Sequence, residues 1–475
     1  MALTRKEKEI FTLRKQRDRH RGEWITQEIV EQYQQKASIL GNDSLEDIGV
    51  KRALRIELQE KYDLLEIEAI NLLNGYHVKD ILRKYERIKN IIPLDVKYEK
   101  VYKTSEEEDE DVIEYNEVMY HKGNAEYPDM DRKIKEFLRD SSASGYEDIC
   151  FMPNASGDMC GFNGISMTLT NRICPNFLGK DVGCGIDAYK LKCKSLDLEK
   201  LDAVLHEHVP IANGRRNSPI KKMDSLRLRE LSFNFYFEEN EILREIGTLG
   251  KRNHFIELGK DKNGCYWLFV HAGSRALGNA FLEYYTEKAV RECPEKTRVG
   301  QAFLIDEAMA QCINDLEIVQ SFAAENRKLI AEKIIGEMQF EVIDQISSVH
   351  TTVDLQCDIM RKGCVSAKKG ERLLIPLNMR DGILICEGKG NESWNESAPG
   401  GLKRIVSESE AKKIPVASYR DALSGVFTTT IDWQDRLHYP DVYAPVREFM
   451  NTINETVEIK EWVKPVYNYR YMAKE

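Results

Sequence analysis

An unbroken acidic run divides this 475-residue chain into two parts with different hydrophobic patterns. The run, SEEEDED at 105–111, repels itself, so we expect residues 104–111 to form a solvated linker. From Val112 onward, glycine turns, short apolar stretches and helical stretches alternate. This alternation predicts an α+β fold, with β-sheets and flanking helices in one domain over residues 112–475.

Residues 1–103 are charged and carry a helical pattern. From Val50 onward, Leu54, Leu58 and Leu65 recur at spacings near one or two helical turns. We therefore expect a helical extension that packs on the core or on another subunit. If they pack on another subunit, these helices are the part of the chain through which it would oligomerise.

The composition is that of an ordinary globular protein, with 42% hydrophobic and 31% charged residues. No apolar run reaches the roughly 18 residues that a membrane span needs, and the charged start lacks a signal-peptide core. Eleven cysteines without a CxxC pair indicate free thiols in a reducing compartment. We therefore expect a cytoplasmic protein with no membrane contact.

The net charge of −10 is unusual for a dedicated nucleic-acid binder, although phosphate binding needs only a local basic surface. The most basic stretch covers residues 215–229. It is either such a surface or a solvated helix face.

Four short segments place a metal-ligand residue beside glycine or a small turn. In the first, GKDVGCG at 179–185, flanking glycines allow Asp181 and Cys184 to point into one cavity. The bland alternative is a glycine turn with a packed cysteine. The second, GTLGKRNHFIE at 247–257, carries His254, which is equally the kind of histidine that packs in a core.

The third segment, HAGSRALG at 271–278, follows an apolar strand, and its histidine and glycine-serine-arginine turn suit a metal or a phosphate. The fourth contains His350, with the basic turn RKG at 361–363 after it. One aspartate, one cysteine and three histidines form a mixed oxygen, sulfur and nitrogen set. Such a set suits manganese or zinc better than magnesium or calcium.

Five motifs together resemble, in order, the signatures of RtcB-type RNA ligases: DVGCG, GTLGKRNHFIE, HAGSRALG, IMRKGCVSA and EGKGNESWNESAP. The resemblance covers roughly residues 112–470. It implies a site for one or two Mn²⁺ ions, with Zn²⁺ as the other option. By matching motif, the ligands are Asp181, Cys184, His254, His271 and His350.

The resemblance also implies that Asn253 contacts metal or phosphate, and that Arg404 and Arg470 contact the nucleotide. The implied function is the joining of RNA 3′-phosphate or 2′,3′-cyclic phosphate ends to 5′-hydroxyl ends, using GTP, in tRNA splicing or RNA repair. The implied partners are RNA with such ends and an activating protein. In that family a histidine attacks GTP, and GMP then passes to the RNA 3′-phosphate.

The chain departs from the family pattern at this nucleophile. The family's histidine begins an HGAGR motif, whereas this chain reads PGGLKR at 399–404, with Gly400 at that position. Glycine cannot form a phosphoramidate. The guanine-site motif is altered to PLNMR at 376–380, which puts the use of GTP in question, and PNAS at 153–156 replaces PDVH.

Three explanations follow from this departure. Another residue takes the nucleotidyl group, with Lys403 as the nearest candidate and His438 as a more distant one; Lys403 is equally a surface lysine or a phosphate contact. In the second explanation the chain is a pseudoligase that binds metal and RNA ends or hydrolyses them. The third is a structural or interaction role, against which five retained ligands argue.

Overall fold

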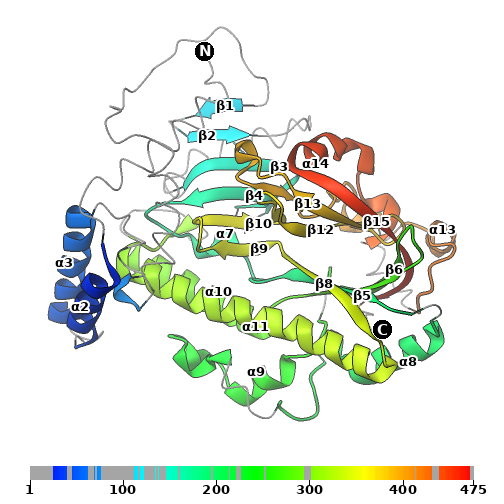
Figure 1. Cartoon of the computed structure of the whole chain (residues 1–475), viewed down its shortest axis with the longest axis horizontal. Coiled ribbons are helices and arrows are strands. Elements are labelled where there is room, and N and C mark those ends of the chain that lie inside the picture. The colour runs from blue at the N-terminus through cyan, green and yellow to red at the C-terminus, as the bar shows by residue number, and fades with distance from the viewer. Residues whose placement is uncertain are drawn as a thin grey trace, which may run out of the picture.

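The structure is a computed structural model, shown in Figure 1. The residues that it describes are 25–39, 45–62, 69, 72–75, 112–115, 118–121, 134, 137, 146–158, 161–193, 196–212, 214–220, 226–250, 253–293, 301–411, 413–429 and 438–470. Helices and curled antiparallel sheets both contribute to the fold, so the predicted α+β class is confirmed. Within these ranges, no helix combines the length and the apolar character that a membrane span requires.

A seven-stranded sheet forms the centre of the molecule. Its strands, in spatial order, are β12 (Arg372–Asn378), β13 (Gly382–Gly388), β15 (Val457–Arg470), β6 (Phe255–Lys260), β7 (Tyr266–Ala272), β5 (Gly185–Leu191) and β8 (Val342–Val349). Every pairing in it is antiparallel. The sheet curls until its two edges approach each other, where Arg372 of β12 donates two hydrogen bonds to Asp344 of β8, at 2.9 and 2.6 Å.

A second sheet lies beside the first. Its six strands, in spatial order, are β1 (Val112–Tyr115), β2 (Val118–His121), β3 (Tyr146–Asp158), β4 (Gly161–Leu169), β10 (Ile359–Lys362) and β9 (Thr351–Asp354). Because β8 belongs to the first sheet and β9 to the second, the chain passes between the sheets at His350. A short pair of strands, β11 (Cys364–Ser366) and β14 (Ser397–Pro399), follows the same junction.

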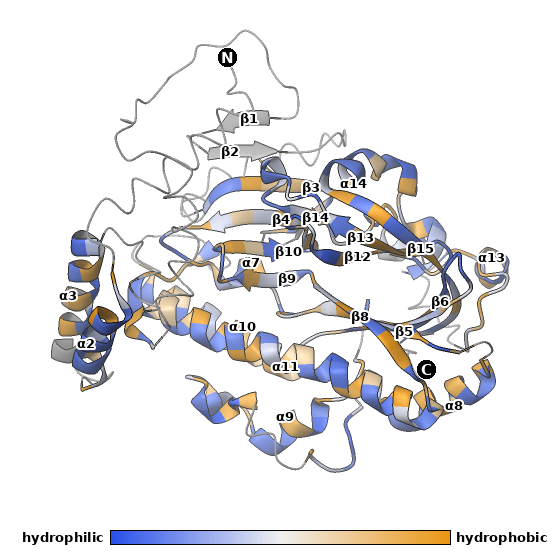
Figure 2. Ribbon diagram, in the orientation of Figure 1, coloured by the Kyte–Doolittle hydropathy of each residue, from blue (hydrophilic) through white to orange (hydrophobic). Residues whose placement is uncertain are grey.

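Two long helices, α10 (Arg275–Glu292) and α11 (Asp306–Met338), cross one side of both sheets (Figure 1). Hydrophobic and hydrophilic residues alternate along them, as expected of helices that cover a sheet with one face (Figure 2). The remaining helices are shorter: α7 (Pro175–Leu178), α8 (Leu198–His208), α9 (Glu239–Glu245), α12 (Glu408–Ala411), α13 (Val416–Ala422) and α14 (Met450–Thr456). Single 3₁₀ turns are η3 (Leu228–Glu230), η4 (Asn234–Tyr236), η6 (Glu392–Trp394), η8 (Pro440–Val442) and η9 (Val446–Glu448).

The N-terminal part contains two described helices, α2 (Gln27–Ser38) and α3 (Leu45–Tyr62). They share a small apolar cluster that includes Val30, Tyr33 and Leu58. Arg55 of α3 forms an ion pair with Asp306 at the start of α11, at 3.3 Å. The expected linker at 104–111 and Leu65 lie outside the described residues, and the boundary at 103 stays a prediction.

Apolar side chains fill the inside of the curled sheet, among them Phe269, Ile346 and Ile385. Glu257 of β6 faces the same side as Phe255 and is almost fully buried. Asn468 of β15 donates to one of its carboxyl oxygens at 2.9 Å. Burial raises the pKa of Glu257 to about 8, an effect that nearby Arg470 only partly offsets.

We predict from this that Glu257→Gln removes part of the pH dependence of stability. In the unfolded chain the glutamate pKa is about 4.3, so the folded state binds the proton more tightly. Protonated Glu257 therefore adds its full contribution to the free energy of unfolding at acid pH, and this contribution is lost as pH rises through about 8. Thermal unfolding measured from pH 5 to pH 8 should show the stability of the variant rising relative to that of the wild type, by on the order of a few kcal/mol.

The matched control is Glu458→Gln, at an exposed glutamate of strand β15. We expect this control to follow the wild type over the same pH range. Parallel pH profiles for Glu257→Gln and the wild type would contradict a neutral buried carboxyl.

Candidate metal centre

The order of the strands brings the predicted metal-binding residues to one end of the central sheet. Because β5 runs antiparallel to both β7 and β8, its first residue, Gly185, pairs with the last residue of each neighbour. Cys184 immediately precedes β5, His271 is next to last in β7, and His350 directly follows β8. Three side chains that are far apart in the sequence therefore meet at this end.

The fourth strand, β6, adds the next residue to the same end. Its first residue, Phe255, pairs with His271 across β6 and β7, and their rings pack edge to face at 5.0 Å. His254, just before β6, therefore lies beside His271. Asp181 reaches the group from the loop that leads into β5, and its carboxylate Oδ2 lies 2.7 Å from His254 Nε2.

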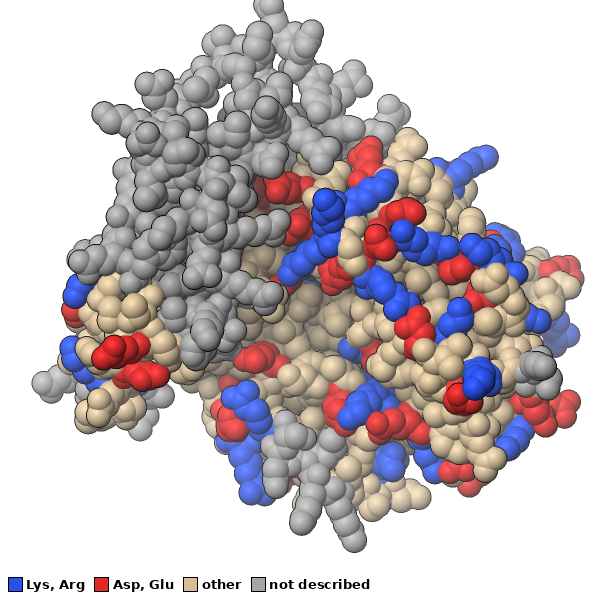
Figure 3. Space-filling view, in the orientation of Figure 1, with Lys and Arg blue, Asp and Glu red and all other residues tan. Residues whose placement is uncertain are grey.

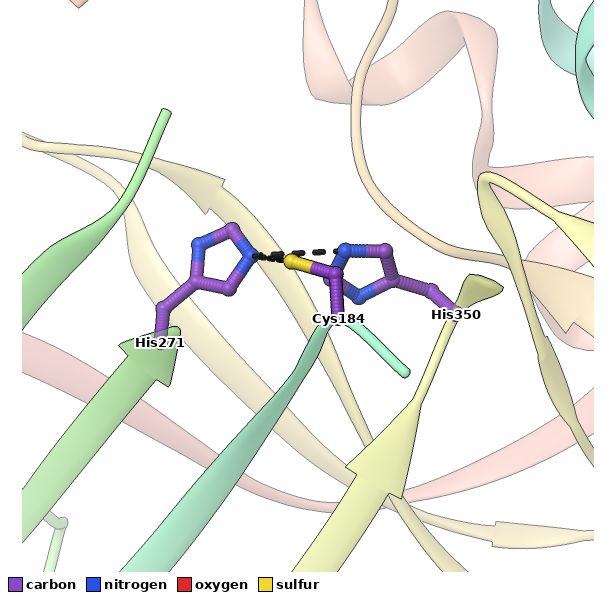
Figure 4. A group of neighbouring side chains, drawn as sticks. All are labelled: Cys184, His271 and His350. Carbon is purple, nitrogen blue, oxygen red and sulfur yellow. Dashed lines mark hydrogen bonds between the residues drawn. The ribbon is translucent and has the colours of Figure 1, made fainter. Parts of the chain in front are cut away.

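The five side chains form two overlapping sets that share one cysteine. Figure 4 shows Cys184, His271 and His350 pointing toward one another from three strands. Cys184 Sγ lies 3.2 Å from His271 Nε2 and 3.4 Å from His254 Nε2, and the Nε2 atoms of His271 and His350 are 3.3 Å apart. In each set, Cys184 with His271 and His350 or Cys184 with Asp181 and His254, the donor atoms lie within 4.8 Å.

The protonation of the histidines suits metal binding. His254 Nδ1 lies 2.8 Å from the carbonyl oxygen of Leu249, which can only accept, so Nδ1 donates and Nε2 is turned toward Asp181 and Cys184. Burial lowers the pKa of His271 well below its usual range and that of His350 to about 4. Both imidazoles are therefore neutral at pH 7, as metal ligation requires.

The carboxylate and the thiol complete the set. Burial alone would raise the pKa of Asp181, but the facing His254 outweighs it and lowers the pKa to about 2. Burial raises the pKa of the Cys184 thiol well above its usual range, and the Asp181 charge adds to this effect. A thiol so placed keeps its proton until a cation approaches. The donor set thus fits a borderline divalent ion.

Two residues expected to contact phosphate or nucleotide lie at the same end of the sheet. Asn253 is exposed in the turn before His254. Arg470, the last residue of β15, pairs with Phe255, and its guanidinium lies over that ring at 4.7 Å. Arg470 therefore stands one ring away from His271. The roles of Asn253 and Arg470 stay predictions.

The other candidate residues lie on two neighbouring segments after β14. Lys403 is half-buried, and its carbonyl accepts a hydrogen bond from Ala444 at 2.9 Å. Arg404 is exposed and pairs with Tyr443 in an isolated bridge. His438 is buried, with Nδ1 3.2 Å from the Tyr443 hydroxyl. Their proposed roles as nucleophile or nucleotide contact also stay predictions.

Gly400, at the position of the family nucleophile, is packed against the backbone. Its N–H donates to the carbonyl of Gly363 at 3.1 Å, and Asn154 Nδ2 donates to the same oxygen at 2.8 Å. Gly363 in turn donates its N–H to the carbonyl of His350 at 2.6 Å. A Cβ atom at position 400 would lie only 2.7 Å from the Gly363 oxygen. Any side chain here requires the backbone to move.

The altered PLNMR segment forms the end of β12 and the turn into β13. The Asn378 side-chain oxygen accepts from the backbone N–H of Arg380 and Asp381, at 3.0 and 2.9 Å. Met379 is fully buried, and Arg380 also donates to Asp441. In this chain, the side chains of this segment stabilise a hairpin turn.

Sequence reasoning missed a group of buried polar residues behind the site. Asn326 and Arg327 of α11 are almost fully buried and hydrogen-bond to the segments that carry the predicted ligands. A signal was present, because Asn326 occupies a position on the stripe of Phe322 and Ile330 that is otherwise apolar. In the basic stretch at 215–229, three of the described arginines form ion pairs with glutamates: Arg215, Arg227 and Arg229.

Comparison with known proteins shows which family this chain resembles. A family model described as tRNA-splicing ligase RtcB matches residues 220–471, more than half of the chain. The matched range contains His254, His271, His350 and Gly400. Asp181 and Cys184 precede it, yet the structure brings them into contact with His254.

Individual relatives agree with the family model. The chain is 25% identical over 312 residues to RNA-splicing ligase RtcB1 of Escherichia coli strain ATCC 25922, covering 57% of this chain and 76% of the relative. It is 26% identical to RNA-splicing ligase RtcB of strain K12 over the same shares. An RtcB homolog 1 of Entamoeba dispar is 24% identical, over 46% of this chain and 55% of the relative. The chain therefore belongs to the RtcB family.

Proposed function

We propose that this chain is a metal-dependent protein of RNA-end ligation and repair. Its relatives are named RNA-splicing ligases. In this proposal the chain joins RNA 3′-phosphate or 2′,3′-cyclic phosphate ends to 5′-hydroxyl ends. The observation that carries this proposal is the convergence of five donor side chains from four separate segments. His271 and His350 are neutral at pH 7 and the Asp181 carboxylate is charged, as such chemistry requires.

The residues of the cluster would bind metal, and the residues beside it would bind phosphate. The two overlapping donor sets would hold one or two Mn²⁺ ions, or Zn²⁺, with Cys184 common to both. A bound divalent ion supplies positive charge that stabilises a transferring phosphoryl group. Arg470 and Asn253 would bind and orient the phosphate from the sides of the cluster, since a guanidinium and an amide both donate to phosphate oxygens.

RNA would be held mainly by its terminal phosphate. On the face in Figure 3, basic and acidic side chains are intermixed over the described part of the chain. Arg215, Arg227 and Arg229 form ion pairs with glutamates, so these three arginines are poorly placed to hold a long RNA. An activating protein, a cytoplasmic location and assembly through the N-terminal helices belong to the same proposal.

A second candidate function is favoured by the packing of Gly400. In this form the protein binds RNA phosphate ends or hydrolyses them, without guanylylation. The backbone contact between Gly400 and Gly363 removes space for the family's nucleophile. Sealing with GTP would then need another nucleophile, for which Lys403 is the nearest candidate.

We predict that Cys184→Ala and His271→Ala each weaken Mn²⁺ binding. Both donors lie in the cluster, and loss of a ligand should weaken affinity by at least about the 10- to 100-fold seen for supporting partners. Isothermal titration and metal analysis of the purified protein measure this. Cys386→Ala removes a buried thiol from a different core cluster and should bind as the wild type does. Unchanged affinity in both ligand variants would remove the proposed site.

We further expect the wild-type protein, with Mn²⁺, to convert RNA ends that carry a 3′-phosphate or cyclic phosphate. Gel analysis of end-labelled RNA would follow the conversion, and Cys184→Ala should lack it. Intact-mass spectra after incubation with GTP then distinguish the GTP-dependent ligase from the protein that binds or hydrolyses RNA ends without guanylylation. A GMP-sized adduct that disappears in Lys403→Arg, together with joined RNA on the gel, would establish ligation through Lys403. Conversion without any adduct would establish the second candidate function.

The packing of Gly400 gives a stability prediction. Gly400→Ala should lower the free energy of unfolding by about 1–3 kcal/mol, because its Cβ would overlap the Gly363 backbone. Gly336→Ala in α11 is the matched control, since its Cβ would meet nothing within 4 Å and alanine favours helix by about 1 kcal/mol. Denaturant unfolding compares the two, and a stabilised Gly400→Ala would refute the packing argument.

A further inference from the structure

One face of helix α11 contacts every segment that carries a predicted metal ligand. The residues that make these contacts are Gln320, Ala323, Asn326 and Arg327, which recur at spacings of three and four and so share one side of the helix. Their partners are mostly backbone groups of the ligand segments. The helix therefore acts on the position of the ligands without reaching the cluster.

Asn326 joins two of these segments with its single amide group. Its Oδ1 accepts from the N–H of Gly247 at 2.7 Å and of Thr248 at 3.1 Å, close to the carbonyl that orients His254. Its Nδ2 donates to the carbonyls of Thr248 at 3.2 Å and Gly273 at 2.9 Å. Gly273 comes two residues after His271, so one buried side chain sets the spacing of two histidines.

Arg327 joins the segments of Cys184 and His271. Its Nη1 donates to the carbonyl of Gly183 at 2.7 Å and to that of Ala272 at 3.2 Å, next to each of these ligands in sequence. Its Nε donates to Asp187 at 3.0 Å on the outer face of β5. The planar guanidinium fixes these three acceptors in one geometry, which an ammonium cannot reproduce.

The remaining contacts complete the set. Gln320 Oε1 accepts from the N–H of Val353 at 3.0 Å and from the Thr352 hydroxyl, three and two residues after His350. Gly183 lies so close to the helix that a Cβ there would stand 2.7 Å from the Ala323 Cβ. The loop with Asp181 and Cys184 is therefore pressed onto the same face.

We propose that Asn326 and Arg327 are positioning residues that set the metal affinity of the cluster by holding the backbone of the segments that carry the ligands. The inference rests on the proposed metal centre. Burial supports it, because both side chains are almost fully buried and their polar atoms are directed to ligand-segment backbone rather than to solvent. A purely structural role would affect stability alone, whereas a positioning role affects affinity at equal stability.

The test uses two conservative variants of the full chain. Asn326→Asp keeps the oxygen that accepts from Gly247 but replaces the amide NH₂ by an oxygen that faces the carbonyls of Thr248 and Gly273. Arg327→Lys keeps the positive charge but loses the planar guanidinium with its several N–H donors. Asp315→Asn is the matched control, since Asp315 is equally buried in α11 but bonds to Ser232 and Tyr285. Thermal unfolding first establishes that all three variants are folded and similarly destabilised.

Two readouts then separate positioning from stability. Co²⁺ titration, followed by the visible spectrum of its thiolate complex, should show affinity about 10- to 100-fold weaker in both test variants. The control should stay close to the wild type. In metal-free protein, iodoacetamide followed by peptide mapping should label Cys184 faster in Arg327→Lys, because the Arg327 guanidinium holds the carbonyl of the preceding Gly183.

The outcomes are distinct. Test variants that bind Co²⁺ as tightly as Asp315→Asn, with the same Cys184 labelling, would overturn the positioning role and leave the metal centre standing. A wild-type protein that binds neither Co²⁺ nor Mn²⁺ would overturn the metal centre and with it the inference. Weaker Co²⁺ binding confined to Asn326→Asp and Arg327→Lys would establish the positioning role.

Discussion

The buried ion pair between Arg327 and Asp187 is the interaction on which the site depends most. A guanidinium enclosed in a protein interior must find acceptors for its hydrogens, because an unpaired buried charge is costly. Here the acceptors are Asp187 and the carbonyls of Gly183 and Ala272. Ser347 donates to the same carboxylate at 2.6 Å, so β5, β7, β8 and α11 are joined around one charge.

The antiparallel order of the central sheet explains why the cluster exists at this end. Strands that alternate in direction bring the beginning of β5 and β6 beside the end of β7 and β8. A residue that precedes one strand can therefore meet a residue that ends its neighbour, however far apart they are in the chain. Cys184 and His350 illustrate this, since the His350 N–H donates to the Cys184 carbonyl at 2.9 Å.

Sequence alone predicted the fold class and the segments that meet, but not what holds them. Cys184 and His271 were recognisable because glycine and strand patterns surround them, and the structure brings them within 3.2 Å. Arg327 was not recognisable, because in a charged helical stretch a buried arginine has the same sequence pattern as a solvated one. The tight packing at Gly400 was also invisible, since it depends on Gly363, which lies far from it in sequence.

The position of His350 between the two sheets has a consequence for cooperativity. The residue ends β8 of the central sheet and leads directly into β9 of the second sheet. A cation held by His350 together with Cys184 and His271 would cross-link the two sheets at their junction. Since such an ion binds only the assembled arrangement, the two sheets would lose their independence and unfold as a single unit when it is present.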